Sequence, residues 1–351
     1  MIRRENDAAA GSLSVMHSVA PRGGQDLARF RRLVNLTIVA TFILIVIGGV
    51  VRVSDSGLGC GPAGSGTEGW PLCGGRALPF LETNAVIEFT HRVAAAVVGI
   101  LILALLWQAA RGLRERRWLV RGSVAAAILV LIQAALGGLT VENNLHEVLV
   151  AAHLGLAMLL LGVLIALRRA TEDGSPARAD AGGLLRPLAA TTLVLLFATI
   201  VAGGYMAGTE REGAEGAPVA GAHLACGTEF PTCVGKALPF GMGEMVDVHL
   251  THRTFMYLAA IAVLALVVVA RRRGVRSWAF PLAALLLACQ ILLGALNVWL
   301  GEHGELIVAH LTLGTLLWGT VVYATMVLVP VPEPRRSPLP RVETEASATP
   351  A

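Results

Sequence analysis

Two stretches decide the fold of this chain: Leu149–Leu156 reads LVAAHLGL, and Leu306–Leu313 reads LIVAHLTL. Each begins a long apolar run that holds one histidine near its start. A polar side chain inside lipid is costly and is usually kept for a function. The same pattern at two places therefore predicts a membrane protein with a repeated unit and a functional histidine in each copy.

The composition supports a protein with several membrane spans. The chain has 351 residues, of which 55% are hydrophobic and 15% are charged, and its mean hydropathy is +0.68. Crossing a bilayer core takes about 20 apolar residues, and we predict helices because backbone groups in lipid must bond within their own segment. The eight predicted helices lie near 33–53, 87–110, 120–141, 147–167, 187–208, 249–270, 277–301 and 306–329.

The basic residues predict the orientation of the chain. Of the 28 Lys and Arg residues, 22 fall in the two terminal tails and in every second connection. The positive-inside rule places these segments, and both termini, in the cytoplasm. The arginines are not interleaved with aromatic residues, so no nucleic-acid partner is expected. The polar tails, residues 1–32 and 330–351, have the composition of disordered cytoplasmic segments.

The two halves of the chain repeat each other. Beyond the two histidine stretches, ALPF, THR and a glutamine recur at offsets of 160, 161 and 157 residues. Each half holds four predicted helices, an even number, so the halves share one orientation. We predict an all-α membrane protein of eight transmembrane helices, arranged as two parallel-repeat four-helix bundles over 33–170 and 185–329.

Four histidines stand at repeat-equivalent positions and at similar depth. Two imidazoles on facing helices can ligate one haem iron from opposite sides. We therefore predict two haem sites, the first formed by His91 and His153 and the second by His252 and His310. Two alternatives remain open: hydrogen-bonded histidines of a bundle core, and a non-haem metal with Glu88 as a further ligand.

Glu88 distinguishes the two halves. It lies three residues before His91 on the same helix face, whereas the second half has His249 in that place. A carboxylate there can accept a proton or stabilise positive charge on a reacting carbon. The alternative is a structural ion pair with Arg92 or Arg52. His249 is a candidate for contact with its neighbouring histidine site.

Three arginines, Arg52, Arg92 and Arg253, lie at the outer ends of helices, against the general charge pattern. An arginine is a good bidentate partner for a haem propionate, and the alternative is contact with lipid phosphate.

Four cysteines occupy the outer loops, two in each half. This placement on the oxidising side predicts two disulfides within the loops, Cys60–Cys73 and Cys226–Cys233.

Taken together, these residues resemble the haem A synthase family. The resemblance rests on SGLGC and WPLC in the first outer loop, EFTHR at the second helix, THR at the sixth, the histidines of the fourth and eighth helices, and one cysteine pair per half. It covers roughly residues 33–329. The loop between Cys60 and Cys73 is longer than the family pattern.

The resemblance implies an oxidoreductase of a bacterial plasma membrane. Such an enzyme oxidises the C8 methyl group of haem O to a formyl group in two hydroxylations followed by loss of water. Matching positions imply that Glu88 is the catalytic carboxylate, that His91 and His153 face haem O, and that His252 and His310 bind haem B. The implied partners are haem O synthase, terminal oxidase assembly factors and an electron donor or acceptor.

Two other functions stay open on the residues. A di-haem electron carrier of the cytochrome b type would also use four histidines, but it has no need of a carboxylate in one half only. A transporter would place polar residues at the midplane of the membrane, whereas here they gather near the outer surface.

Overall fold

The structure is a computed structural model that describes residues 22–79, 81–172, 183–212, 218–219, 221–301 and 303–330. Most of the two tails predicted to be disordered lies outside the described residues, namely 1–21 and 331–351. The membrane-spanning architecture is therefore described almost completely, with gaps in four connections.

In the part of the chain that the structure describes, eight helices are long and apolar enough to cross a membrane, as predicted. They are α1 Arg22–Val53, α2 Thr83–Gly112, α3 Arg117–Glu142, α4 Glu147–Ala170, α5 Leu185–Gly208, α6 Glu244–Arg272, α7 Ala279–Trp299 and α8 Gly304–Val327. The remaining elements are the short helices η1 Gly66–Glu68 and η4 Ala222–Leu224 and the two-residue strands β1 Arg211–Glu212 and β2 Pro218–Val219, which pair antiparallel.

The first helix begins earlier than the sequence indicated. The predicted disordered tail extended to residue 32, but α1 already begins at Arg22, so the prediction is wrong for residues 22–32. Phe30 is fully buried against α2, beside Ile102 and Leu105. The apolar face of the membrane span thus continues into the basic segment, and this packing keeps the segment helical.

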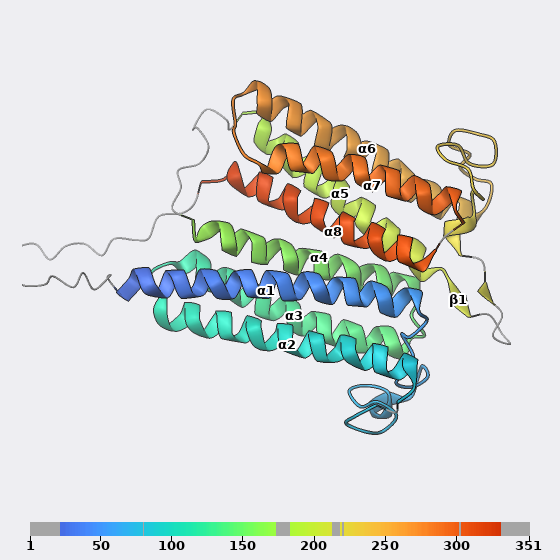
Figure 1. Ribbon diagram of the computed structural model, residues 1–351, viewed down its shortest axis with the longest axis horizontal. Helices are drawn as coiled ribbons and strands as arrows, with labels where there is room; N and C mark the ends of the chain where they lie inside the picture. The colour runs from blue at the N-terminus through green and yellow to red at the C-terminus, as the bar shows by residue number, and fades with distance from the viewer. Residues whose placement is uncertain are drawn as a thin grey trace, which may run out of the picture.

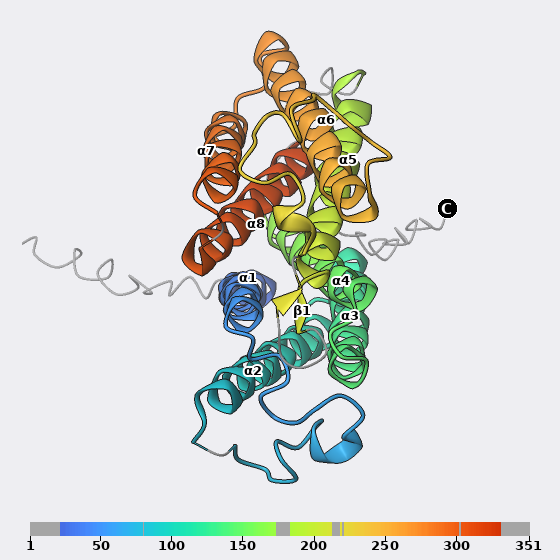
Figure 2. The same ribbon diagram turned by 90° about the vertical axis from the view of Figure 1, so that its right-hand side faces the viewer.

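The helices form two groups of four. In the first group α2 and α4 each contact α1 and α3, and in the second α6 and α8 each contact α5 and α7. The groups meet where α4 contacts α5 and α8 and where α1 contacts α8. Figure 2 looks at the groups end on, with α5–α8 in the upper part and α1–α4 in the lower part. That the groups are repeats with limits 33–170 and 185–329 stays a prediction.

The two ends of the helix assembly differ. Both disulfide loops lie at one end, which we call the loop end, and the end of α8 and the start of α1 lie at the other (Figure 1). A buried core joins the two groups between these ends. There Trp318 on α8 donates a hydrogen bond of 2.8 Å to the carbonyl of Met158 on α4. This core fixes the helices whose loop-end segments carry the histidines.

Candidate functional site

The four predicted ligand histidines all lie near the loop end, one on each even-numbered helix. His91 and His252 each stand eight residues after the first residue of their helix, and His153 and His310 each stand six residues after theirs. At a rise of about 1.5 Å per residue, these positions are roughly 12 Å and 9 Å along the helix. The two halves therefore present their histidines at matching depths.

The histidines pair within each half. α2 and α4 stand diagonally in their ring of helices, as α6 and α8 do in theirs. His91 and His153 thus stand on one diagonal pair of helices, and His252 and His310 stand on the other. That each pair of imidazoles holds one iron stays a prediction.

Several nitrogens of these rings have no partner. Among the described residues, Nδ1 of His91, His153 and His310 is buried and makes no hydrogen bond. Two of the rings do have a partner: Nδ1 of His252 lies 3.0 Å from the carbonyl oxygen of Thr199 on α5, and Nε2 of His310 lies 3.0 Å from Nε2 of Gln290 on α7. Buried polar atoms are nearly always satisfied, so a group of unpartnered imidazole nitrogens indicates a site that takes a ligand.

The side-chain chemistry of the sites fits haem better than a bare metal ion. Zinc and non-haem iron sites usually take three or four protein ligands. Across the described ranges, no group of three or more His, Cys, Asp or Glu residues is placed to hold a metal ion. A pair of histidines on opposite sides is the axial set that a haem iron uses. The alternative of a non-haem site with Glu88 as a ligand finds no support in this geometry.

Glu88 is buried, and both of its carboxylate oxygens accept hydrogen bonds. Its side chain is 4% exposed, and its Oε2 accepts a hydrogen bond of 2.7 Å from the backbone N–H of Cys60. Its Oε1 accepts a hydrogen bond from Arg92, one turn further along α2. The ion pair with Arg92 is the structural alternative that the sequence left open. The bond to Cys60 was not predicted, because the two residues are far apart in sequence.

Arg92 attaches the first outer loop to α2. Its Nη1 donates to the carbonyls of Gly69 and Leu72, at 2.7 and 2.8 Å. Both residues lie between Cys60 and Cys73, in the part of the loop that is longer than the family pattern. The longer loop is therefore held on the helix that carries His91.

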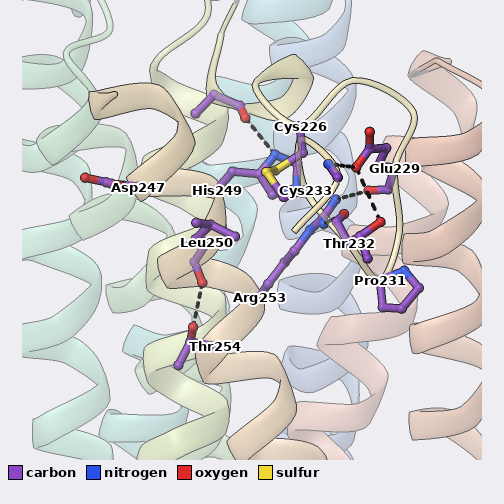
Figure 3. The surroundings of a disulfide bond; sticks show 12 residues. Cys226, Glu229, Pro231, Thr232, Cys233, Asp247, His249, Leu250, Arg253 and Thr254 are labelled. Atoms are coloured by element: carbon purple, nitrogen blue, oxygen red, sulfur yellow. Dashed lines mark hydrogen bonds between the residues drawn. A yellow bond between two sulfur atoms is a disulfide. The ribbon is translucent and has the colours of Figure 1, made fainter. Parts of the chain in front are cut away.

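The second half holds its outer loop in a similar way (Figure 3). Arg253 donates to the carbonyls of Thr232 and Glu229, each at 2.8 Å. His249, which takes the place of Glu88, has its Nδ1 2.8 Å from the carbonyl oxygen of Ala222. In both halves the residue three positions before the ligand candidate and the arginine that follows it bind the backbone of the loop.

Arg52 joins the two halves at the loop end. From the last turn of α1 it donates to the carbonyl of Ala207 on α5 at 2.6 Å, and to the backbone carbonyl of Glu210 at 2.7 Å. Arg52, Arg92 and Arg253 therefore all bind backbone carbonyls. The propionate role expected for these arginines stays a prediction. In the structure, Arg92 and Arg253 hold the outer loops on their helices, and Arg52 joins the two groups of helices.

Glu210 lies just beyond α5, and its carboxylate has two side-chain partners. Its Oε1 lies 2.6 Å from Nδ1 of His223, and its Oε2 lies 3.5 Å from Arg52. Burial by itself raises the pKa of Glu210, but the hydrogen bond and charge of His223 and the charge of Arg52 outweigh burial. The pKa of Glu210 is therefore lower than its ordinary value.

Both predicted disulfides are confirmed. The sulfur atoms of Cys60 and Cys73 are 2.02 Å apart, and those of Cys226 and Cys233 are 2.04 Å apart. In each loop the second cysteine forms an antiparallel bridge with the residue three positions later. The longer spacing in the first half is accommodated by η1, without loss of the disulfide.

The chain matches a known protein family over most of its length. The family model described as cytochrome oxidase assembly protein matches residues 77–322, which span most of both groups of helices. The chain belongs to this family. It is 30% identical to a haem A synthase of Symbiobacterium thermophilum over 318 residues, which cover 86% of this chain and 96% of that protein.

Two further relatives carry the same name. A haem A synthase of Halalkalibacterium halodurans is 29% identical over 310 residues, covering 84% of this chain and 95% of the relative. One of Alkalihalophilus pseudofirmus is 28% identical over 307 residues, covering 84% and 95%. The resemblance to the haem A synthase family seen in the motifs is thus confirmed over nearly the whole length of the relatives.

Proposed function

We propose that the protein is a haem A synthase, which converts haem O to haem A for the assembly of a terminal oxidase. The observation that carries the proposal is the presence of two pairs of buried histidines, at matching depth on diagonal helices, in a chain of this family. Haem, when bound, would supply the redox-active iron, and these four imidazoles would hold it. The reaction oxidises a methyl group to a formyl group, so the enzyme is an oxidoreductase.

We assign the two histidine pairs to different haems. His91 and His153 would hold the substrate haem O, and His252 and His310 would hold a resident haem B. The supporting difference between the halves is the residue three positions before the first ligand of each pair. That residue is a carboxylate, Glu88, in the first half and an imidazole, His249, in the second. A negative charge beside only one of the sites suits chemistry at that site.

Glu88 is the residue that we propose to act on the reacting carbon. Its carboxylate is oriented by the N–H of Cys60 and by Arg92, so it needs no rearrangement to face a developing positive charge. Charged groups that are fixed in advance in a site of low polarity stabilise such charge more effectively than mobile ones. The same contacts also hold the loop, so the two roles must be separated by experiment.

We place the loop end on the outside of a bacterial plasma membrane and both chain termini in the cytoplasm. The support is the excess of arginine at the opposite end and the position of the two disulfides. Haem O reaches the protein from the membrane, where a haem O synthase releases it. Haem A passes on to oxidase assembly factors, and the oxidation requires an electron acceptor or donor.

The pigment of the purified protein tests the proposal. Haems are extracted and identified by pyridine haemochrome spectra and by mass. Haem B together with haem O or haem A supports the synthase. Haem B alone, at two per chain, supports the di-haem electron carrier instead, and a protein without haem excludes both functions.

A further inference from the structure

Each of the four ligand candidates lies with one edge of its ring against a glycine of the preceding helix. A Cβ atom placed on these glycines would lie 3.2 Å from Cε1 of the first two histidines and 3.0 Å from Cε1 of the other two. The pairs are Gly48 with His91, Gly137 with His153, Gly203 with His252, and Gly294 with His310. A side chain at any of these positions would crowd the ring, which would have to move by a few tenths of an ångström.

Because Gly203 has no side chain, the ring of His252 can form a hydrogen bond to the backbone of α5. Its Nδ1 reaches the carbonyl oxygen of Thr199 at 3.0 Å, and Thr199 lies one turn before Gly203 on α5. That carbonyl also accepts the backbone N–H of Gly203 in the helix. Because Gly203 has no side chain, the imidazole can lie against the α5 backbone. A Cβ at Gly203 would be only 3.2 Å from Nδ1, so the ring would have to move by a few tenths of an ångström and the hydrogen bond to the carbonyl would weaken.

This hydrogen bond decides which ring nitrogen faces the iron. A carbonyl oxygen can only accept, so Nδ1 of His252 must carry the proton. Nε2 then keeps its lone pair for a metal. A hydrogen bond of this kind holds the ring orientation and makes the ligand more basic, and losing it typically lowers metal affinity about 10- to 100-fold.

We infer that Gly203 is a positioning residue for the haem B ligand His252, and that Gly48, Gly137 and Gly294 position their histidines through the same contact. The inference rests on the proposed haem function. The effect is strongest at Gly203, because His252 alone of the four has its Nδ1 bonded to a backbone carbonyl within the described residues. One ligand of the resident haem is thereby fixed, whereas neither ligand of the substrate pair is.

Helix propensity does not account for these glycines. Alanine is the stronger helix former, so a glycine inside a helix needs another reason. Two other glycines of the spans provide matched controls. A Cβ on Gly99 of α2 would meet nothing within 4 Å, and one on Gly162 of α4 would lie at an ordinary 3.7 Å from Trp318.

The test compares Gly203→Ala with Gly99→Ala and Gly162→Ala in the full-length protein purified with its haem. Haem B per chain, the midpoint potential and the low-spin electron paramagnetic resonance signal are measured. Gly203→Ala should bind haem B about 10- to 100-fold more weakly. Its potential should shift upward, because a less basic ligand stabilises the ferric state less. The two control variants should match the wild type.

Further variants keep the inference falsifiable. Gly48→Ala should disturb only the substrate haem and leave the haem B potential unchanged. If Gly203→Ala does not fold, Gly294→Ala replaces it; because Nδ1 of His310 has no carbonyl partner to lose, the expected result there is weaker haem B binding from crowding of the ring. An unchanged potential and spectrum in Gly203→Ala would overturn the inference, and so would equal haem loss in the control variants. A wild-type protein that binds no haem would overturn the proposed function itself.

Discussion

Glu88 and Arg92 lie one turn apart on α2 and form an ion pair whose side chains are 4% and 15% exposed. Each partner also binds the first outer loop, Glu88 through the N–H of Cys60 and Arg92 through the carbonyl of Gly69. The carboxylate that we propose to act on the substrate is therefore also an attachment point of the disulfide loop. Experiments on Glu88 must separate these two effects.

Replacing Glu88 by glutamine should slow the chemistry more than it weakens substrate binding. The amide oxygen of Gln can still accept from Cys60, but the negative charge is lost. Removal of a key charge-stabilising group typically costs about 100-fold or more in rate. Glu88→Gln should thus bind haem O and form little haem A, as measured by haem extraction and chromatography from cells that supply haem O.

The matched control for Glu88→Gln is Arg92→Lys. Lysine keeps a positive charge for Glu88 but cannot reproduce the fork of hydrogen bonds to the loop carbonyls. Haem A formation in Arg92→Lys should stay well above that in Glu88→Gln. If the two variants lose activity equally, loop attachment explains the effect. Wild-type activity in Glu88→Gln would make the residue purely structural.

The second histidine pair should hold a haem that survives purification. Removal of one of two axial ligands leaves the iron site incomplete, so His252→Ala and His310→Ala should each deplete haem B. The measurement is haem B per chain by pyridine haemochrome. His303→Ala is the control, because His303 is exposed at the start of α8. Full haem B content in both ligand variants would refute the assignment.

The disulfides should be inaccessible to thiol reagents until they are reduced. Intact cells are treated with a membrane-impermeant maleimide before and after a reductant. Label should appear on the four loop cysteines only after reduction, because the loop end faces outward. A Cys289→Ser variant removes the free cysteine of α7 from the background. Labelling of the loop cysteines without reductant would contradict the prediction.

Glu210 should make the stability of the protein depend on pH on the acid side. Its pKa is lowered by folding, so its stabilising effect is fully present above the ordinary carboxyl value, about 4.5, and is lost as the pH falls through the lower folded value. In detergent, Glu210→Gln should unfold at a lower temperature than the wild type from pH 7 down to about 5. Below about pH 4.5 the difference in unfolding temperature between Glu210→Gln and the wild type should shrink.

The comparison variant for this pH dependence is Glu305→Gln. Glu305 is an exposed acidic residue in the first turn of α8, near the loop end. Its substitution should leave the unfolding temperature close to that of the wild type throughout. A difference between wild type and Glu210→Gln that stays constant down to pH 3 would show that the carboxylate charge is not responsible.

The number of spans, the histidine positions and the cysteine pairs followed from the sequence. Hydropathy is a local property, and eight apolar runs of sufficient length must become helices in lipid whatever their neighbours are. Because the two halves of the sequence can be aligned with each other, His153 could be matched with His310 without any structure. The two disulfides could also be predicted from local sequence, because the two cysteines of each pair lie in the same loop.

Contacts between distant segments were decided only by the tertiary structure. Arg52 binds Ala207, 155 residues away, and no local pattern marks that partner. The glycines beside the histidines look like ordinary small residues of a membrane helix until the neighbouring helix is placed against them. Similarly, Phe30 keeps residues 22–32 helical because it is buried against α2, whereas the basic composition of that segment alone favoured disorder. The sequence determined which residues enter the membrane, and the packing of helices and loops determined what each polar side chain binds there.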